Sequence, residues 1–184
     1  MLKSINKVSI SKSALFLVLY NIVESTVSMA FEELHEKIKS TEFNKLSPKL
    51  KILYVEYHFK QRKTNDVVRL LEETANTTVG LPKLEEYLKR INLFSGNLDA
   101  REINSIFNKY GIRNLQNKSR KNLLLVKNKR NKLAHGEESF KASGRGFTIG
   151  ELQKLVVAVT ETMTELIDSV ESYLVHQQYL AKNS

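Results

Sequence analysis

The sequence predicts an all-α protein, an antiparallel bundle of about four main helices with short helices between them. Only two prolines and seven glycines occur in 184 residues. Apolar residues recur at intervals of three and four over long segments, and no segment alternates as a strand does. A chain of this length can bury a core without disulfides, and we expect residues 1–184 to form a single helical domain.

The first expected helix runs from about Ser11 to Lys39. Its apolar stripe comprises Phe16, Tyr20, Val23, Val27, Phe31, Leu34 and Ile38. Lysines before the apolar run 14–23 resemble the start of a signal peptide, but the amphipathic pattern continues beyond that run. The run is also short for a membrane span, so we interpret it as a core helix.

The middle of the chain predicts shorter helices. Ser47 and Pro48 are typical of a helix start, and that helix should extend to about residue 58. Weaker signals predict one or two helical turns over 66–74 and a short helix over 81–91 opened by Pro82. Asp99 is placed to cap a helix through Tyr110, which Gly111 should end.

The last third predicts two helices joined by a polar loop. A basic helix is expected over about 114–134, with Leu115, Leu123, Val126 and Leu133 as its buried stripe. Residues 137–147 read as a glycine-containing loop. Thr148 and Glu151 have the spacing of a capping box, and Phe147 and Leu152 that of its hydrophobic staple, so a long final helix begins there.

The net charge of +9 lies in one part of the chain. Residues 101–135 hold ten Lys or Arg against one acidic residue, while the remainder has equal numbers of both. A positive field concentrated in this way attracts polyanions such as nucleic acid. A solvated helix face is the alternative interpretation of the same charges.

The basic helix ends in the sequence Arg130-Asn131-Lys132-Leu133-Ala134-His135, followed by Gly136. An arginine, four residues and a histidine at the end of a helix resemble the signature of the HEPN superfamily. The polar residue after the arginine, the following Gly-Glu and the long closing helix fit that pattern. The stretch Tyr20-Asn21 with Glu24 is similar to stand-alone prokaryotic members in toxin–antitoxin and phage-defence loci.

The resemblance implies an all-α ribonuclease whose motif acts in a dimer. It therefore implies a metal-independent endoribonuclease that serves as a toxin or a phage-defence effector. Some HEPN members paired with nucleotidyltransferase antitoxins carry a tyrosine two residues after the histidine. Here Glu137 occupies that position, and regulation by modification of such a tyrosine is not expected.

The chemistry of RNA cleavage suits the residues of the motif. A base must take the 2′-hydroxyl proton, an acid must protonate the leaving oxygen, and cations must neutralise the phosphate. His135 can serve as base or acid, Arg130 can bind phosphate with two N–H groups, and Asn131 can orient His135 or hold RNA. Glu24 is expected either to support the site from behind or to pair with a lysine. The residues expected along the RNA backbone are Lys118, Arg120, Lys121, Lys127, Lys129 and Lys132.

Helix geometry argues that one chain holds half of the site. Five residues along a helix turn through roughly 500°, so Arg130 and His135 point about 140° apart. One chain therefore provides a poor catalytic pair unless the helix unwinds near Gly136. Two copies related by a two-fold axis could place both motifs around one phosphate. We therefore expect a homodimer as the active form, with neither a metal ion nor another cofactor.

Two non-catalytic functions remain open from the sequence. One is a HEPN module that binds RNA, a nucleotide or a protein, and the other is a helical adaptor whose basic helix docks an acidic protein. The expected partners are RNA, a second copy of the chain, and a cognate antitoxin or defence-system protein, with no membrane. The absence of cysteine fits a reducing compartment, and we expect the cytoplasm.

Overall fold

A computed structural model describes residues 2–59, 81–94, 97–116 and 120–182, and it confirms the all-α class. The expected helical turns over 66–74 lie outside the described residues. The chain separates into two compact units, each assembled from three segments. The first unit comprises 1–27, 96–104 and 115–167, and the second comprises 28–95, 105–114 and 168–184. The expectation of a single domain stays a prediction.

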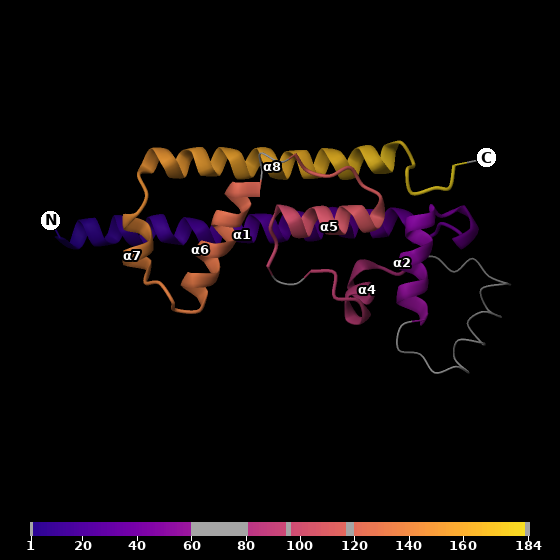
Figure 1. Ribbon diagram of the computed structural model, residues 1–184, viewed down its shortest axis with the longest axis horizontal. Helices are drawn as coiled ribbons and strands as arrows, with labels where there is room; N and C mark the ends of the chain where they lie inside the picture. The colour runs from indigo at the N-terminus through magenta and orange to yellow at the C-terminus, as the bar shows by residue number, and fades with distance from the viewer. Residues whose placement is uncertain (1, 60–80, 95–96, 117–119, 183–184) are drawn as a thin grey trace. The chain divides into compact units, whose positions relative to one another are not determined.

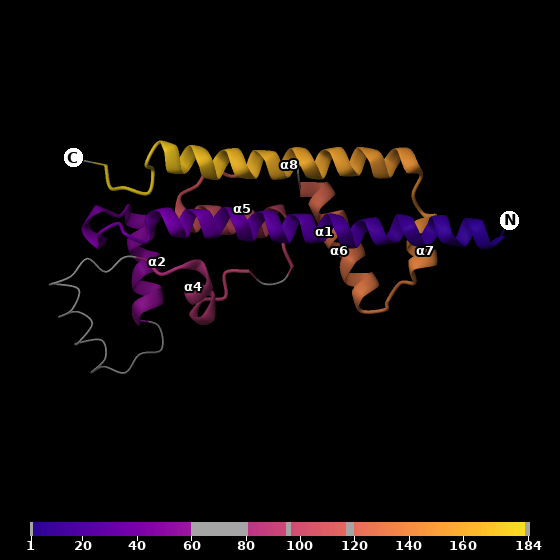
Figure 2. The same ribbon diagram turned by 180° about the vertical axis from the view of Figure 1, so that it is seen from behind.

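The first unit is built on two long helices that lie side by side. They are α1, Leu2–Ile38, and α8, Ile149–Val175, of which residues up to 27 and up to 167 belong to this unit. Within it the two helices run in the same direction (Figures 1 and 2). The Phe16 and Phe147 rings are 5.1 Å apart, and Lys12 Nζ donates to the Phe147 carbonyl at 2.7 Å.

That parallel arrangement differs from the antiparallel one expected from the sequence. Short loops force consecutive helices to run antiparallel, but α1 and α8 are not consecutive. The chain between them includes α6, Arg120–Ala134, and α7, Phe140–Arg145. Helix α6 crosses the direction of α1 in both ribbon views (Figures 1 and 2).

Helix α7 packs directly on the backbone of α1. A Cβ added at Gly144 would lie 1.9 Å from the Ser9 carbonyl oxygen, so only glycine permits this approach. Ser13 Oγ donates to the Phe140 carbonyl, which holds the other end of α7 on the same helix. The expectation of an irregular loop over 137–147 was wrong here, because Ser139 caps this short helix by accepting from the Ala142 N–H at 3.2 Å.

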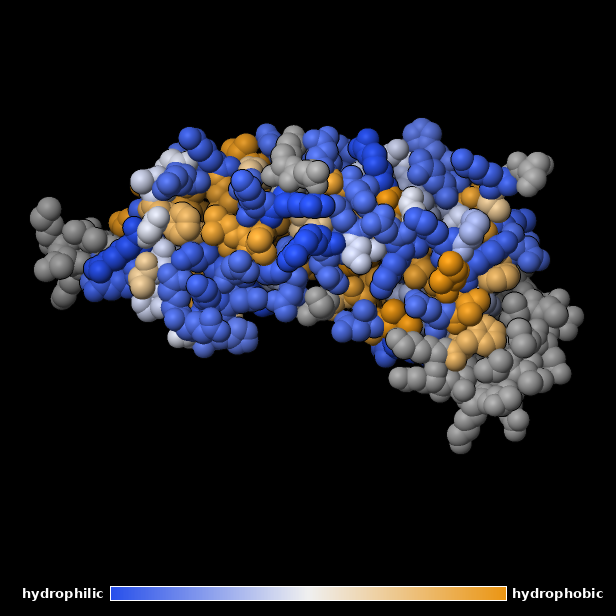
Figure 3. Space-filling view, viewed as in Figure 1, coloured by the Kyte–Doolittle hydropathy of each residue, from blue (hydrophilic) through white to orange (hydrophobic). Residues whose placement is uncertain are grey.

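The second unit has an aromatic core around His35. Its helices include α2, Pro48–Phe59, and α4, Leu84–Arg90, and a 3₁₀ turn spans Phe43–Lys45. His35 is fully buried between the Pro82 carbonyl at 2.8 Å and the Tyr110 hydroxyl at 2.7 Å. The Tyr173 hydroxyl donates to the Tyr110 carbonyl at 2.8 Å. Apolar side chains also reach the surface of α2, where Ile52 and Val55 are exposed (Figure 3).

Two predicted helix boundaries were confirmed by their capping contacts. Helix α5, Ala100–Tyr110, begins after Asp99, whose Oδ1 accepts the N–H groups of Arg101 at 2.9 Å and Glu102 at 3.1 Å. Gly111 ends it with a φ of +86°. At the start of α8, Thr148 Oγ1 accepts the Glu151 N–H at 3.2 Å, and Glu151 Oε2 accepts the Thr148 N–H at 2.7 Å.

Other boundaries moved. Helix α1 begins at Leu2 rather than near Ser11, and α4 begins two residues after Pro82. Helix α6 is described from Arg120, and residues 112–116 before it are not helical. The Asn104 amide holds this non-helical stretch, because its Oδ1 accepts the Leu115 N–H at 2.8 Å and its Nδ2 donates to the Leu115 carbonyl.

The apolar part of α1 is longer than the sequence suggested. A window within Asn6–Ile38 has a mean hydropathy of 1.6, so by length and composition this helix could cross a membrane. A third of that window is buried, and the buried residues include Phe16, Tyr20, Val23 and Val27. Burial of this stripe is typical of a core helix, as expected. The expectation that the apolar run is too short to span a membrane was wrong.

Candidate functional site

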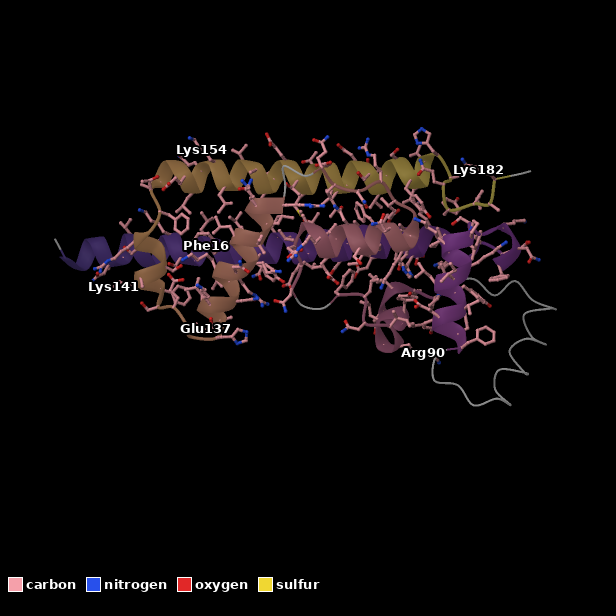
Figure 4. All side chains as sticks on the ribbon, in the orientation of Figure 1. Phe16, Arg90, Glu137, Lys141, Lys154 and Lys182 are labelled. Carbon is pink, nitrogen blue, oxygen red and sulfur yellow. The ribbon has the colours of Figure 1, made fainter. Side chains whose placement is uncertain are left out.

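The C-terminal end of α6 presents His135 to solvent. The His135 N–H still bonds the Asn131 carbonyl at 2.9 Å, and Gly136 then turns the chain with a φ of +71°. The Gly136 N–H reaches back to the Leu133 carbonyl at 3.3 Å, which closes the helix end. His135 is exposed, and no hydrogen bond or ion pair joins its imidazole to another described residue. Glu137 lies just beyond this end of α6 (Figure 4).

Arg130 lies over a buried aromatic ring. Its guanidinium carbon is 4.4 Å from the centroid of the Tyr20 ring, and Nη1 donates to Asn131 Oδ1 at 3.0 Å. Tyr20 itself is fully buried on α1, and its hydroxyl accepts the Leu98 N–H at 3.0 Å. A cation over the face of an aromatic ring is attracted by the ring quadrupole. Arg130 is therefore held on one face by Tyr20 and at one edge by Asn131.

The Tyr20 hydroxyl remains protonated at neutral pH. Burial raises its pKa above the ordinary value of tyrosine, and the Glu24 carboxylate acts in the same direction by charge and by a hydrogen bond. The Leu98 N–H and the Arg130 charge act in the opposite direction without reversing the shift. Glu24 therefore lies close to the hydroxyl of the ring that carries Arg130, and its role at the site stays a prediction.

The Asn131 side chain points toward the segment before α5. Its Nδ2 donates to Asn97 Oδ1 at 2.6 Å, while its Oδ1 accepts from Arg130. The sequence suggested that Asn131 could orient His135, since the two are four residues apart on a helix. In the structure the Asn131 amide is instead engaged by Arg130 and Asn97, and only its backbone carbonyl contacts His135, through the N–H.

Lys127 and Lys129 are engaged in ion pairs within the first unit. Lys127 Nζ pairs with the buried Asp99 carboxylate, and Lys129 Nζ lies 2.9 Å from Glu138 Oε2 and 5.5 Å from the centroid of the Phe147 ring. Burial alone would raise the pKa of Asp99, but hydrogen bonds from Lys127 and from two backbone N–H groups outweigh it and lower that pKa. Both lysines thus anchor α6, and each is only partly exposed.

The other expected RNA-binding cations divide into two groups. Arg120, Lys121 and Lys132 are exposed on α6, where a polyanion could reach them. Lys118 lies outside the described residues. In the space-filling view hydrophilic residues cover the C-terminal end of α6 (Figure 3). Fewer exposed Lys and Arg side chains of α6 therefore contribute to the positive surface than the charge count of the sequence implied.

The structure joins Arg130 and Asn131 but leaves His135 apart from them. Arg130 is directed onto Tyr20 of α1, whereas His135 follows the last helical residue, Ala134, and faces solvent. Their angular separation of about 140° on one helix is the reason that both cannot face the same neighbour. Within the described residues no group of three His, Cys, Asp or Glu side chains is placed to bind a metal ion.

Comparison with protein families places these residues in a known context. The model of the MAE_28990-like HEPN family matches residues 2–179, which is nearly the whole chain. The chain belongs to this family. HEPN domains are generally ribonucleases or nucleotide-binding domains. No curated protein and no solved structure matches the chain significantly.

Two contacts of the HEPN motif were not predicted from the sequence. Asn97 contacts Asn131 across 34 positions, and Tyr20 lies under Arg130 from a helix more than a hundred residues earlier. Tyr20 stood in the stretch that resembles other HEPN members, but neither spacing nor periodicity could place it under Arg130. Asn97 follows a glycine in the sequence, and asparagine beside glycine is common in turns for local reasons.

Proposed function

We propose that this HEPN protein is a metal-independent endoribonuclease. The observation that supports the proposal most directly is the state of the motif at the end of α6. Arg130 is held by an aromatic ring and an amide, with N–H groups left to bind phosphate, and His135 is exposed where it can exchange protons.

The reaction follows from these groups. A histidine takes the proton of a ribose 2′-hydroxyl, and the resulting oxygen attacks the adjacent phosphorus. The bond from phosphorus to the 5′-oxygen breaks, and that oxygen receives a proton from a second histidine in its protonated form. The products are a 2′,3′-cyclic phosphate and a 5′-hydroxyl end. Arg130 neutralises the phosphate oxygens as negative charge accumulates in the transition state.

The need for a base and an acid supports a composite site. One chain supplies one histidine in this motif, and its own Arg130 faces a different direction. In a homodimer with two-fold symmetry, each His135 would lie near the Arg130 of the partner, and two histidines would serve one phosphate. The exposed cations Arg120, Lys121 and Lys132 would follow the RNA backbone on either side.

A cytoplasmic toxin or phage-defence effector is the biological role we propose. An unrestrained ribonuclease harms its own cell, so the active surface must be controllable by a partner. An acidic antitoxin or defence-system protein could cover the exposed cations at the end of α6. The support for this role is the resemblance of the motif and of the stretch 20–24 to such HEPN members.

The decisive test compares purified wild type with His135→Ala on single-stranded RNA in EDTA. The wild type should cleave RNA, and His135→Ala should lose at least about a hundredfold in rate, as expected for loss of a proton-transfer group. His176→Ala is the matched control, because that histidine is also exposed but contacts only Ser172 in the described structure. Equal absence of cleavage by the wild type and His135→Ala would contradict the catalytic proposal.

A non-catalytic HEPN module that binds RNA or a nucleotide is the second candidate. One chain positions Arg130, which can bind an anion, but gives the His135 ring no orienting partner among the described residues. This arrangement supports anion binding without catalysis. For this candidate, Arg130→Ala should weaken RNA binding although no cleavage product appears. Light scattering that finds a monomer at the concentration of the cleavage assay would count against the composite site.

A further inference from the structure

Three consecutive residues, 97–99, contact the motif-bearing helix or the ring beneath it. The contacts are Asn131 Nδ2 to Asn97 Oδ1 at 2.6 Å, Leu98 N–H to the Tyr20 hydroxyl at 3.0 Å, and the ion pair between Asp99 and Lys127. Positions 127, 130 and 131 are three and four residues apart, so they share one face of α6. The segment 97–99 therefore lies along the same face as Arg130.

The hydrogen bonds from Arg130 to Asn97 have a fixed direction. A guanidinium has only donors, so the group of Asn131 that meets Arg130 must be its oxygen. The Asn131 NH₂ group is then turned toward Asn97, and Asn97 must offer its own oxygen. Any amide rotated by 180° would bring two donors or two acceptors together. The chain Arg130 to Asn131 to Asn97 is thus consistent in one arrangement.

We propose that Asn97 is a positioning residue that acts on Arg130 through Asn131. With Asn97 in place, the Asn131 oxygen stays aimed at Arg130, and the guanidinium is held over the Tyr20 ring. Without Asn97, the Asn131 amide can rotate and Arg130 loses its edge contact. Asn97 itself is exposed, so its removal leaves no buried cavity.

The physical benefit lies in the conformational freedom of arginine. A free arginine side chain loses rotamer entropy when it binds phosphate, and this loss weakens binding. The contacts to Tyr20 and Asn131 restrict the side chain before RNA arrives. In the described contacts they use one of the five N–H donors, so the others can still bind phosphate. Preorganisation of this kind raises affinity and fixes the orientation of the charge.

This inference deepens the proposed function, since the anion that Arg130 binds is taken to be RNA. The experiment therefore measures binding separately from cleavage. An RNA with 2′-O-methyl riboses cannot be cleaved by 2′-hydroxyl attack but retains its phosphates. Failure of cleavage would then contradict the ribonuclease proposal, while the binding measurement still tests the role of Asn97.

The test is a double-mutant cycle of Asn97→Ala, Asn131→Ala and the double variant, with affinity for the 2′-O-methyl RNA measured at one salt concentration. Asn97→Ala should weaken binding about fivefold, the factor expected for one net hydrogen bond. If Asn97 acts through Asn131, the double variant should bind as Asn131→Ala does. Asn21→Ala, which changes an exposed asparagine next to Tyr20, is the control and should bind as the wild type does.

A spectroscopic measurement reports on Arg130 without any RNA. The Nε–H proton of a guanidinium above an aromatic ring is shifted by the ring current, so the Arg130 signal should move toward the free value in Asn97→Ala. An unchanged Arg130 signal together with unchanged affinity would overturn the proposal. Additive losses in the cycle would also overturn it, because two residues that act independently contribute separately.

Discussion

The two ends of the same six-residue motif lie in different environments. Arg130 is supported by Tyr20 and Asn131, and Asn131 is in turn supported by Asn97. His135, five positions later, is exposed beyond the last turn of α6 and has no hydrogen-bond partner for its ring among the described residues. The arginine end is thus organised within one chain, and the histidine end is not.

In the proposed reaction, this difference separates anion binding, for which one chain positions a side chain, from proton transfer, for which it does not. Binding of an anion requires a positioned positive charge, and the first unit supplies it. Proton transfer requires a histidine with a defined orientation relative to the reacting oxygen. We expect that orientation to come from a second copy of the chain and from bound RNA. Substitutions at the two ends of the motif test this division.

The largest effects are expected from substitutions of Arg130 and His135, which should differ in how they change the cleavage rate and the RNA affinity. Arg130→Ala should lower the cleavage rate by about 10²–10³-fold, since it removes charge stabilisation of the transition state, and it should also weaken RNA binding. His135→Ala should lower kcat with little change in RNA affinity. Arg130→Lys keeps the charge but loses the planar fork and should fall between. Equal losses of affinity in Arg130→Ala and His135→Ala would contradict the division.

A smaller effect is expected from the ring under Arg130. Tyr20→Leu removes the aromatic face and should weaken RNA binding about fivefold, in line with a cation–π contact of roughly 1 kcal/mol. Tyr20→Phe keeps the face and should bind RNA nearly as the wild type does, although loss of the hydroxyl leaves the Leu98 N–H unpaired and lowers stability. Affinity measured well below both melting temperatures distinguishes the two effects. Equal RNA affinities of Tyr20→Leu and Tyr20→Phe would show that the Tyr20 ring does not contribute to RNA binding through Arg130.

The anchor of α6 should appear as a loss of stability. Asp99→Ala removes the N-cap of α5 and leaves Lys127 without its carboxylate, so the free energy of unfolding should fall by about 2 kcal/mol. Glu138→Ala, which breaks the more exposed pair with Lys129, should cost up to about 1 kcal/mol. Urea denaturation of both variants measures the comparison. A larger loss in Glu138→Ala would show that Asp99 is not the principal anchor.

The smallest expected effect concerns His35, which is fully buried, whereas His135 is exposed. Burial lowers the pKa of His35, and its bond to the Pro82 carbonyl opposes that shift only in part. As pH falls below about 6.5, the unfolded chain therefore binds this proton before the folded one does. The stability contribution is complete above that pH and is lost as pH falls toward the folded pKa. His35→Gln should show a weaker decline in melting temperature than the wild type between about pH 7 and pH 5, as measured by thermal denaturation at each pH.

The sequence predicted best what neighbouring residues decide. The capping box of Thr148 and Glu151, and Asp99 as the cap of α5, depend on contacts within three positions, and both were confirmed. Helix α7 was missed although Ser139 is a good cap, because a six-residue helix with little apolar surface has no periodicity to detect. The start of α6 was placed too early because the Asn104 side chain binds the Leu115 N–H outside the helix, a contact that depends on the tertiary structure.

The residues of the candidate site also fall into two groups, those with a local sequence pattern and those that tertiary contacts bring close. The residues Arg130, Asn131 and His135 were proposed as site residues because their spacing along one helix is a local pattern, and that role stays a prediction. Their supports on α1 and before α5 come from distant parts of the chain, so no local pattern could reveal them. The charge count predicted that α6 binds RNA, which stays a prediction, and it could not show that Lys127 and Lys129 are paired with Asp99 and Glu138.

The most direct test of the composite site is subunit exchange between the wild type and the inactive His135→Ala variant. The proposed reaction uses one histidine as base and a second as acid, so a mixed dimer, which carries a single His135, should be nearly inactive. When an equal amount of His135→Ala is added and the subunits exchange freely, RNA cleavage should fall to about half of the rate of the unmixed wild type, because half of the wild-type chains then lie in mixed dimers. A mixture that forms mixed dimers but keeps the full wild-type rate would contradict a site shared between two chains.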